Sequence, residues 1–192
     1  MRISICFAIA LSLIPISGCQ EKHGAASGPS TPALHSVYTD LSGLSCKKEI
    51  DKDDPNETPY LVCPGVAGYS LVVRLVDSGR VSVDVVDPTK RLWPLKYDES
   101  VTRHMSNLAG QAEWRVTASQ VPVALIVRVE AHEDSENPGK VTHSYMAVAK
   151  IGEAEACVTD RLVAGIQSEA EIRGAADSAT KRPCAAPLPV TH

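Results

Sequence analysis

Short segments in which apolar and polar residues alternate recur along this chain, and they constrain its fold more than any other feature of the sequence. Val81, Val83 and Val85 alternate with polar neighbours, which is the pattern of a strand with one buried and one solvated face. A similar run covers residues 68–76, and the segment 77–79 between the two has the sequence DSG, which is typical of tight turns. The pattern therefore predicts a β-hairpin.

Further strands are expected in the second half of the chain. Every second residue of the segment 112–118 is apolar, so Trp114 should point into the core. The segment 123–129 repeats this alternation with Arg128 on the opposite face, and 141–151 follows after a long polar turn. Shorter strand candidates are 37–41, 46–50, 60–63, 91–95 and 156–159.

Two segments have the spacing of a helix instead. Val101, Met105 and Leu108 recur at helical spacing in 98–110, where Gly110 offers a stop. This pattern predicts a short helix in the middle of the chain.

Residues 168–182 are expected to form a C-terminal helix. Ser168 and Glu171 have the spacing of a capping box, which satisfies backbone N–H groups at a helix start. The apolar stripe consists mostly of alanines, so the helix buries little area and needs a pin to stay in place. A disulfide between Cys157 and Cys184 would supply that pin.

The order of these elements favours a mainly β fold of the α+β class. Strands precede and follow the short helix, the connections suit antiparallel pairing, and there is no βαβ alternation. We therefore expect an antiparallel β-sandwich or a partly open barrel, with the C-terminal helix packed on it.

The N-terminal segment is typical of an export signal. Its start is positively charged, residues 3–14 are mainly apolar, and small residues precede a cysteine. The apolar run is shorter than the roughly 20 residues needed to span a bilayer. The segment Ile16-Ser17-Gly18-Cys19 resembles the lipobox of bacterial lipoprotein signal peptides.

The resemblance implies that the chain is cut before Cys19, which then carries diacylglycerol and an amide-linked acyl chain such as palmitate. Several acyl chains hold a protein firmly on a membrane. Gln20 follows the cysteine where an Asp would mark retention at the inner membrane, so the implied place is the outer membrane of the cell envelope, facing the periplasm. An ordinary cleaved signal peptide, with Cys19 incidental, is the alternative.

The predicted export signal implies different roles for the six cysteines. Cys6 would leave with the signal peptide and Cys19 would take lipid, which leaves an even set of four in an exported protein. Four thiols allow three pairings, and the sequence excludes none of them. We favour Cys46 with Cys63 and Cys157 with Cys184, because the partners lie near each other in the chain.

Four parts of the chain follow from these signals. Residues 20–36 are rich in Gly, Ala, Ser and Pro and lack apolar periodicity, which is the composition of a flexible tether. The expected parts are a signal peptide at 1–18, the lipidated Cys19 with its tether at 19–36, one β-rich domain at 37–184 and a loose tail at 185–192.

Composition excludes some partners. The chain has 19 basic and 23 acidic residues, and no basic run stands out. Nucleic-acid binding requires a basic surface, often with clustered aromatics, so no nucleic-acid partner is expected. The only Phe, Phe7, lies in the signal segment.

Motifs for catalysis are weak. Ser70 lies in a strand pattern, in a GYSLV segment that lacks the second glycine of a nucleophile elbow. The segment 132–136 begins like a zinc-protease motif, but Glu136 stands where the second His is needed. His143 could add a metal ligand to this segment only from the other strand of a hairpin. A solvated acidic turn is the simpler interpretation.

Metal sites are also weakly supported. The acidic segment 51–57 has alternating oxygen ligands, but Pro55 stiffens it and the glycine of a calcium loop is missing. The cysteines lack the spacing of a zinc site. No metal or other cofactor is therefore expected.

Three functions remain open. We expect a non-enzymatic binding or structural module of the envelope whose partner is an envelope protein or a polysaccharide, with Trp93 and the loop at 64–65 as surface candidates. One alternative is a hydrolase or other enzyme that uses His104, His132 or His143. Another is an inhibitor of a cell-wall-degrading hydrolase.

Overall fold

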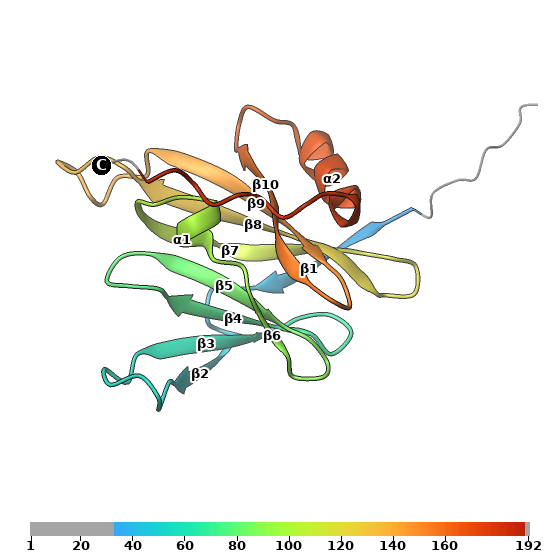
Figure 1. The fold of residues 1–192 in the computed structure, drawn as a ribbon, viewed down its shortest axis with the longest axis horizontal. Helices are drawn as coiled ribbons and strands as arrows, with labels where there is room; N and C mark the ends of the chain where they lie inside the picture. The colour runs from blue at the N-terminus through green and yellow to red at the C-terminus, as the bar shows by residue number, and fades with distance from the viewer. Residues whose placement is uncertain (1–32, 191–192) are drawn as a thin grey trace, which may run out of the picture. The chain divides into compact units, whose positions relative to one another are not determined.

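The computed structural model describes residues 33–190, so the lipobox and the rest of 1–32 lie outside the described residues. Figure 1 shows two antiparallel β-sheets that face each other. They form a sandwich and do not close into a barrel, which decides between the two expected architectures. No helix of the described part is long and apolar enough to cross a lipid bilayer.

The first sheet, sheet A, contains the longest strands. Its order is β1-β7-β8-β9-β10 and every neighbouring pair is antiparallel. The strands are β1 (His35–Asp40), β7 (Met105–Val116), β8 (Pro122–His132), β9 (His143–Ile151) and β10 (Ala156–Val163).

The second sheet, sheet B, follows the chain order β2-β3-β4-β5-β6, as expected for strands joined by short turns. The predicted hairpin is confirmed: Leu71 pairs with Val85, and Val76 donates its N–H to the Arg80 carbonyl across the turn. The strands are β2 (Lys47–Ile50), β3 (Pro59–Pro64), β4 (Ser70–Leu75), β5 (Val81–Val86) and β6 (Leu92–Pro94).

The core lies between the sheets and is centred on Trp114, whose side chain is fully buried as the alternation predicts. The indole Nε1 donates to Thr39 Oγ1 at 3.0 Å, and that hydroxyl donates to the Pro64 carbonyl at 3.0 Å. The one polar atom of the indole is therefore satisfied inside the core. Aliphatic side chains from both sheets complete it, among them Leu71, Val83, Val85, Leu125, Val127 and Val129.

The prediction of a helix at 98–110 is wrong. The structure has a short helix α1 (Tyr97–Ser100), and strand β7 begins at Met105. Met105 and Leu108 pair with His132 and Val129 of β8, so the strand ladder overrides the apolar spacing. A register shift between Leu108 and Ala112 interrupts strict alternation, which hid the strand from the pattern.

The C-terminal helix is confirmed. It comprises α2 (Glu169–Asp177) and a 3₁₀ turn η1 (Ala179–Lys181), and the capping box of Ser168 and Glu171 is formed. Figure 1 shows α2 on the side of sheet A that faces away from sheet B. There Ile172 and Ala176 pack on Ala124, Ile126 and Val148, in a small second core.

Both ends of the expected domain differ slightly from the structure. Strand β1 begins at His35, inside the expected tether, and β10 extends to Val163. The expected loose tail is held as far as Leu188. Ala185 donates its N–H to the Val158 carbonyl, and Leu188 donates to the Glu99 carbonyl, each at 2.7 Å. Backbone hydrogen bonds of this kind do not depend on residue type, so the composition of residues 185–192 could not predict them.

Candidate binding surface

The predicted disulfides are both formed. Cys46 is bonded to Cys63, and Cys157 is bonded to Cys184. The second bond ties the chain after η1 to strand β10, as the need for a pin suggested. Glu155 lies close to this pair, but a disulfide offers no thiolate to a metal ion. The lipidation residue Cys19 and the cleavage motif Ile16-Ser17-Gly18 lie outside the described residues and stay predictions.

Three hollows surround the end of strand β4, and each has both Arg74 and Leu75 in its lining. The second lies on the face of sheet B that carries Leu61, Val73 and Val81, and the third lies on the opposite face, with Ser82 and Asp84. Their volumes are about 550, 330 and 390 Å³. We call this combined surface the Arg74 groove. It forms because the β4–β5 hairpin ends beside the β2–β3 loop, which leaves Leu75 46% and Val76 42% exposed.

The three hollows differ in chemistry. The first, between the β2–β3 loop and the β4–β5 turn, contains the carboxylates of Asp51, Asp54 and Asp77. The second is mainly apolar and is lined by Leu61, Val73, Leu75 and Val81. The third has Ser82 and Asp84 in its lining, with Leu92, Pro94, Lys96 and Asp98 around them. The groove therefore combines acidic ends with an apolar part.

Arg74 holds the centre of the groove through an ion pair with Asp84. Arg74 Nη2 lies 2.7 Å from Asp84 Oδ2, and the Asp84 carboxylate is almost fully buried. Burial raises the pKa of Asp84, and the charge of Arg74 opposes this shift. Arg74 Nε is buried without a hydrogen-bond partner, and the guanidinium lies 6.0 Å from the Tyr60 ring centre. One donor of the guanidinium is therefore unused inside the groove.

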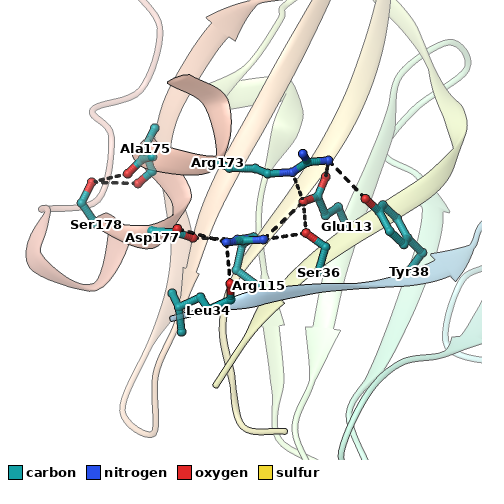
Figure 2. A network of polar contacts seen from close by, with 10 residues as sticks. Leu34, Ser36, Tyr38, Glu113, Arg115, Arg173, Ala175, Asp177 and Ser178 are labelled. Atoms are coloured by element: carbon teal, nitrogen blue, oxygen red, sulfur yellow. Dashed lines mark hydrogen bonds and ion pairs between the residues drawn. The ribbon is translucent and has the colours of Figure 1, made fainter. Parts of the chain in front are cut away.

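A second polar cluster, the α2 clamp, joins the helix to sheet A (Figure 2). Arg115, on β7, donates through Nε and Nη2 to Asp177 at 2.6 and 3.0 Å, and through Nη1 to Ser36 Oγ at 2.6 Å. On the same face Arg173 donates from Nε to Glu113 at 2.7 Å. Figure 2 shows these side chains meeting between the helix and strands β1 and β7.

The α2 clamp is satisfied from within. The Arg115 side chain is only 8% exposed, and its remaining bond goes to the Leu34 carbonyl. Glu113 accepts from Ser36 and from Arg173, and its hydrogen bond with Arg173, together with its charge, raises the pKa of Arg173. A hollow of about 350 Å³ lies beside the clamp, but its main charged groups already face each other. The clamp thus fastens the helix to sheet A. The Arg74 groove contains more charged and polar groups that lack a partner within the described residues.

The histidines proposed for catalysis have separate surroundings. His104 is exposed, His132 Nε2 contacts Asn107 Nδ2 at 3.1 Å, and His143 Nδ1 lies 2.8 Å from Glu133. Within residues 33–190, no hydrogen bond joins two of these three histidines. They are therefore not assembled into one site by direct contact.

Other residues singled out by sequence lie in ordinary structural positions. Ser70 begins strand β4 and pairs with Val86. Trp93 is half-buried against the core, with the Arg91 guanidinium 4.7 Å from its ring centre. In the acidic loop, Asp54 accepts the N–H groups of Asn56 and Thr58, which closes the loop on itself. Such closure favours a structural role for the loop carboxylate.

Sequence reasoning missed the Arg74 groove. The one available signal was that Leu75 and Val76 are both apolar, so alternation fails just before the turn and one of the two must face outward. The groove itself is built from the β2–β3 loop, the β4–β5 hairpin and the segment around β6 and α1, which no local pattern brings together.

No protein-family model, no curated protein sequence and no solved structure matches the chain significantly.

Proposed function

We propose that this chain is a lipid-anchored binding module of the bacterial cell envelope, without catalytic activity of its own. In this proposal, lipid on Cys19 holds it at the outer membrane facing the periplasm, and the Arg74 groove receives an envelope partner. The observation that carries the proposal is the groove, where three hollows with exposed apolar and acidic side chains surround the end of strand β4. Exposed apolar patches of this kind often mark interaction sites.

The arrangement of charged groups supports binding more than catalysis. A general acid or base needs a proton-transfer partner within reach, usually a second polar group poised near the substrate. In the groove, Asp84 is paired with Arg74, and Asp77 is paired with Arg80. Carboxylates that are already paired in this way are poorly placed to transfer a proton to or from a substrate.

Anchoring is tested by Cys19→Ser. We expect this substitution to abolish metabolic labelling by palmitate and to leave the protein unprocessed or released from the membrane, because the acyl acceptor sulfur is gone. Cys6→Ser is the matched control and should be labelled like the wild type. Labelling that survives in Cys19→Ser would contradict the anchor.

Binding through the groove is tested in cells with the full-length lipidated protein. A photoreactive phenylalanine analogue is placed at Leu75 in the groove, or at Leu44, which is 94% exposed and lies outside it. We expect a discrete crosslinked species from position 75 and none of that mass from position 44. Identical patterns from both positions, or no crosslink at 75, would contradict a binding role for the groove.

A further inference from the structure

The apolar part of the Arg74 groove does not stand alone. Leu92, which is 41% exposed, adds apolar surface in the third hollow, on the face of sheet B opposite to the Leu75 side chain. Ile50, 51% exposed, pairs with Pro59, and Pro59 lines the first and second hollows. A partner that covers these side chains would remove apolar surface from water, which favours binding.

Negative charge predominates around this apolar surface. The three hollows are lined by six carboxylates and three cationic side chains. Asp51, Asp54 and Asp98 form no ion pair with any Lys, Arg or His of residues 33–190. The remaining three, Asp77, Asp84 and Glu99, pair with Arg80, Arg74 and Lys96. A docked group therefore meets an excess of negative charge at both acidic ends of the groove.

We propose that the partner of the Arg74 groove is a basic segment of a protein. The segment passes around the end of the β4–β5 hairpin, so that its Lys or Arg side chains meet Asp51 and Asp98 while its apolar side chains cover Leu75 and the second hollow. The inference rests on the proposed binding function and names the class of partner. Complementary charge speeds encounter and selects the partner, while the apolar contact supplies most of the affinity.

The charges of the groove disfavour the other occupants. Nucleic acid and anionic lipid headgroups are polyanions, and they would be repelled by the unpaired carboxylates. A second copy of this chain would bring an equally acidic groove, and the chain as a whole carries a net charge of −4. Two such surfaces repel when they face each other, so self-association becomes an outcome that the test must be able to reveal.

The charge of the partner is tested with detergent-solubilised full-length protein on a peptide array. The peptides have constant length and apolar content, and their net charge runs stepwise from strongly negative to strongly positive. We expect retention to rise with positive charge and to fall as salt screens the interaction. Asp51→Asn and Asp98→Asn should each weaken retention of the basic peptides by about 2- to 5-fold, as expected for one exposed charge.

The matched control is Asp53→Asn, which removes the same charge from the same loop at an exposed residue outside the lining of the groove. It should leave retention unchanged. The apolar contribution is compared in Leu75→Ser and in Leu44→Ser, and only the first should weaken retention. Circular dichroism of each variant verifies that the fold is kept.

Failure of the inference is distinguishable from failure of the proposed function. A crosslink at Leu75 to a neutral or acidic protein segment, or retention independent of peptide charge, would overturn the basic partner and keep the binding module. Sedimentation showing a dimer that Leu75→Ser dissolves would also overturn it. Absence of both crosslink and retention would overturn the inference together with the function on which it rests.

Discussion

At the scale of single residues, one very close approach in the sandwich occurs where the loop after β3 passes Trp114. A Cβ atom added to Gly65 would lie 2.8 Å from Trp114 Cζ2 and 2.9 Å from the Tyr69 carbonyl oxygen. The Gly65 N–H also donates to that carbonyl at 3.0 Å, so the loop has little freedom to move away. Glycine is required here by close approach, and the indole fixes the position of the loop.

Gly65→Ala should therefore destabilise the protein. We expect the free energy of unfolding to fall by about 1 to 3 kcal/mol, as for overpacked cores, in urea titrations followed by Trp fluorescence. Gly139→Ala is the control, because a Cβ there has no neighbour within 4 Å. Equal stability of the two variants would show that the loop relaxes without cost.

Asp87 organises the turn between β5 and β6. Its carboxylate accepts from the Thr89 hydroxyl at 2.6 Å and from the N–H groups of Thr89 and Arg91. These hydrogen bonds, that of Thr89 first, lower the pKa of Asp87 from 3.8 to about 2. The ionised form is therefore favoured in the folded state.

The sign of the pH dependence follows from this shift. Because the folded pKa is lower than the unfolded one, the stabilisation is complete above about pH 4 and is lost as the pH falls from 3.8 towards 2. Asp87→Ala should lower the melting temperature at neutral pH, and its difference from the wild type should shrink across that window. Scanning calorimetry at several pH values measures this, and a difference that stays constant down to pH 2 would refute the assignment.

At the scale of elements, the C-terminal helix depends on contacts that its own sequence does not supply. Of its residues, Ile172 and Ala176 are buried against sheet A, so the apolar contact is small. The α2 clamp and the Cys157–Cys184 bond add fixed points at Asp177 and after η1. Short helices are marginal alone, and these contacts explain why α2 stays on the sheet.

Arg115→Ala should loosen the helix. Removing the guanidinium leaves Asp177 without its partner and Ser36 Oγ without the donor that it accepts from, and hydrogen bonds to charged groups contribute about 1.5 to 3 kcal/mol each. We expect lower stability and faster amide hydrogen exchange in α2. Arg128→Ala removes an exposed cation that forms no ion pair within residues 33–190, and it should leave exchange in α2 unchanged. Protection of α2 that is equal in both variants would refute the clamp.

At the scale of the whole molecule, two sheets share one core and differ in what they expose. Sheet A covers its outer face with α2, whereas the end of sheet B at the β4–β5 hairpin keeps the Arg74 groove open. Six carboxylates and three cationic side chains line the hollows at this end. The tests of partner charge therefore probe the summed negative charge of several segments and not the charge of one residue.

How much the sequence alone determined depends on how local each feature is. The β4–β5 hairpin, the inward Trp114 and the capping box follow from residues that are near neighbours in the chain, and the structure confirms them. The two disulfides that nearness in the chain favoured are also present, although the sequence excluded no pairing. Alternation and capping are local because side-chain direction repeats every few residues. Local features of this kind can be predicted from the sequence without knowledge of the tertiary structure.

Only the tertiary structure decided the rest. Residues 105–108 have helical spacing, but pairing with β8 made them a strand, because ladder bonds come from a distant segment. In the α2 clamp, Ser36 and Glu113 are 77 positions apart. The Arg74 groove likewise unites segments from Asp51 to Asp98. Contacts of this kind depend on how the sheets pack, so no local pattern contains them.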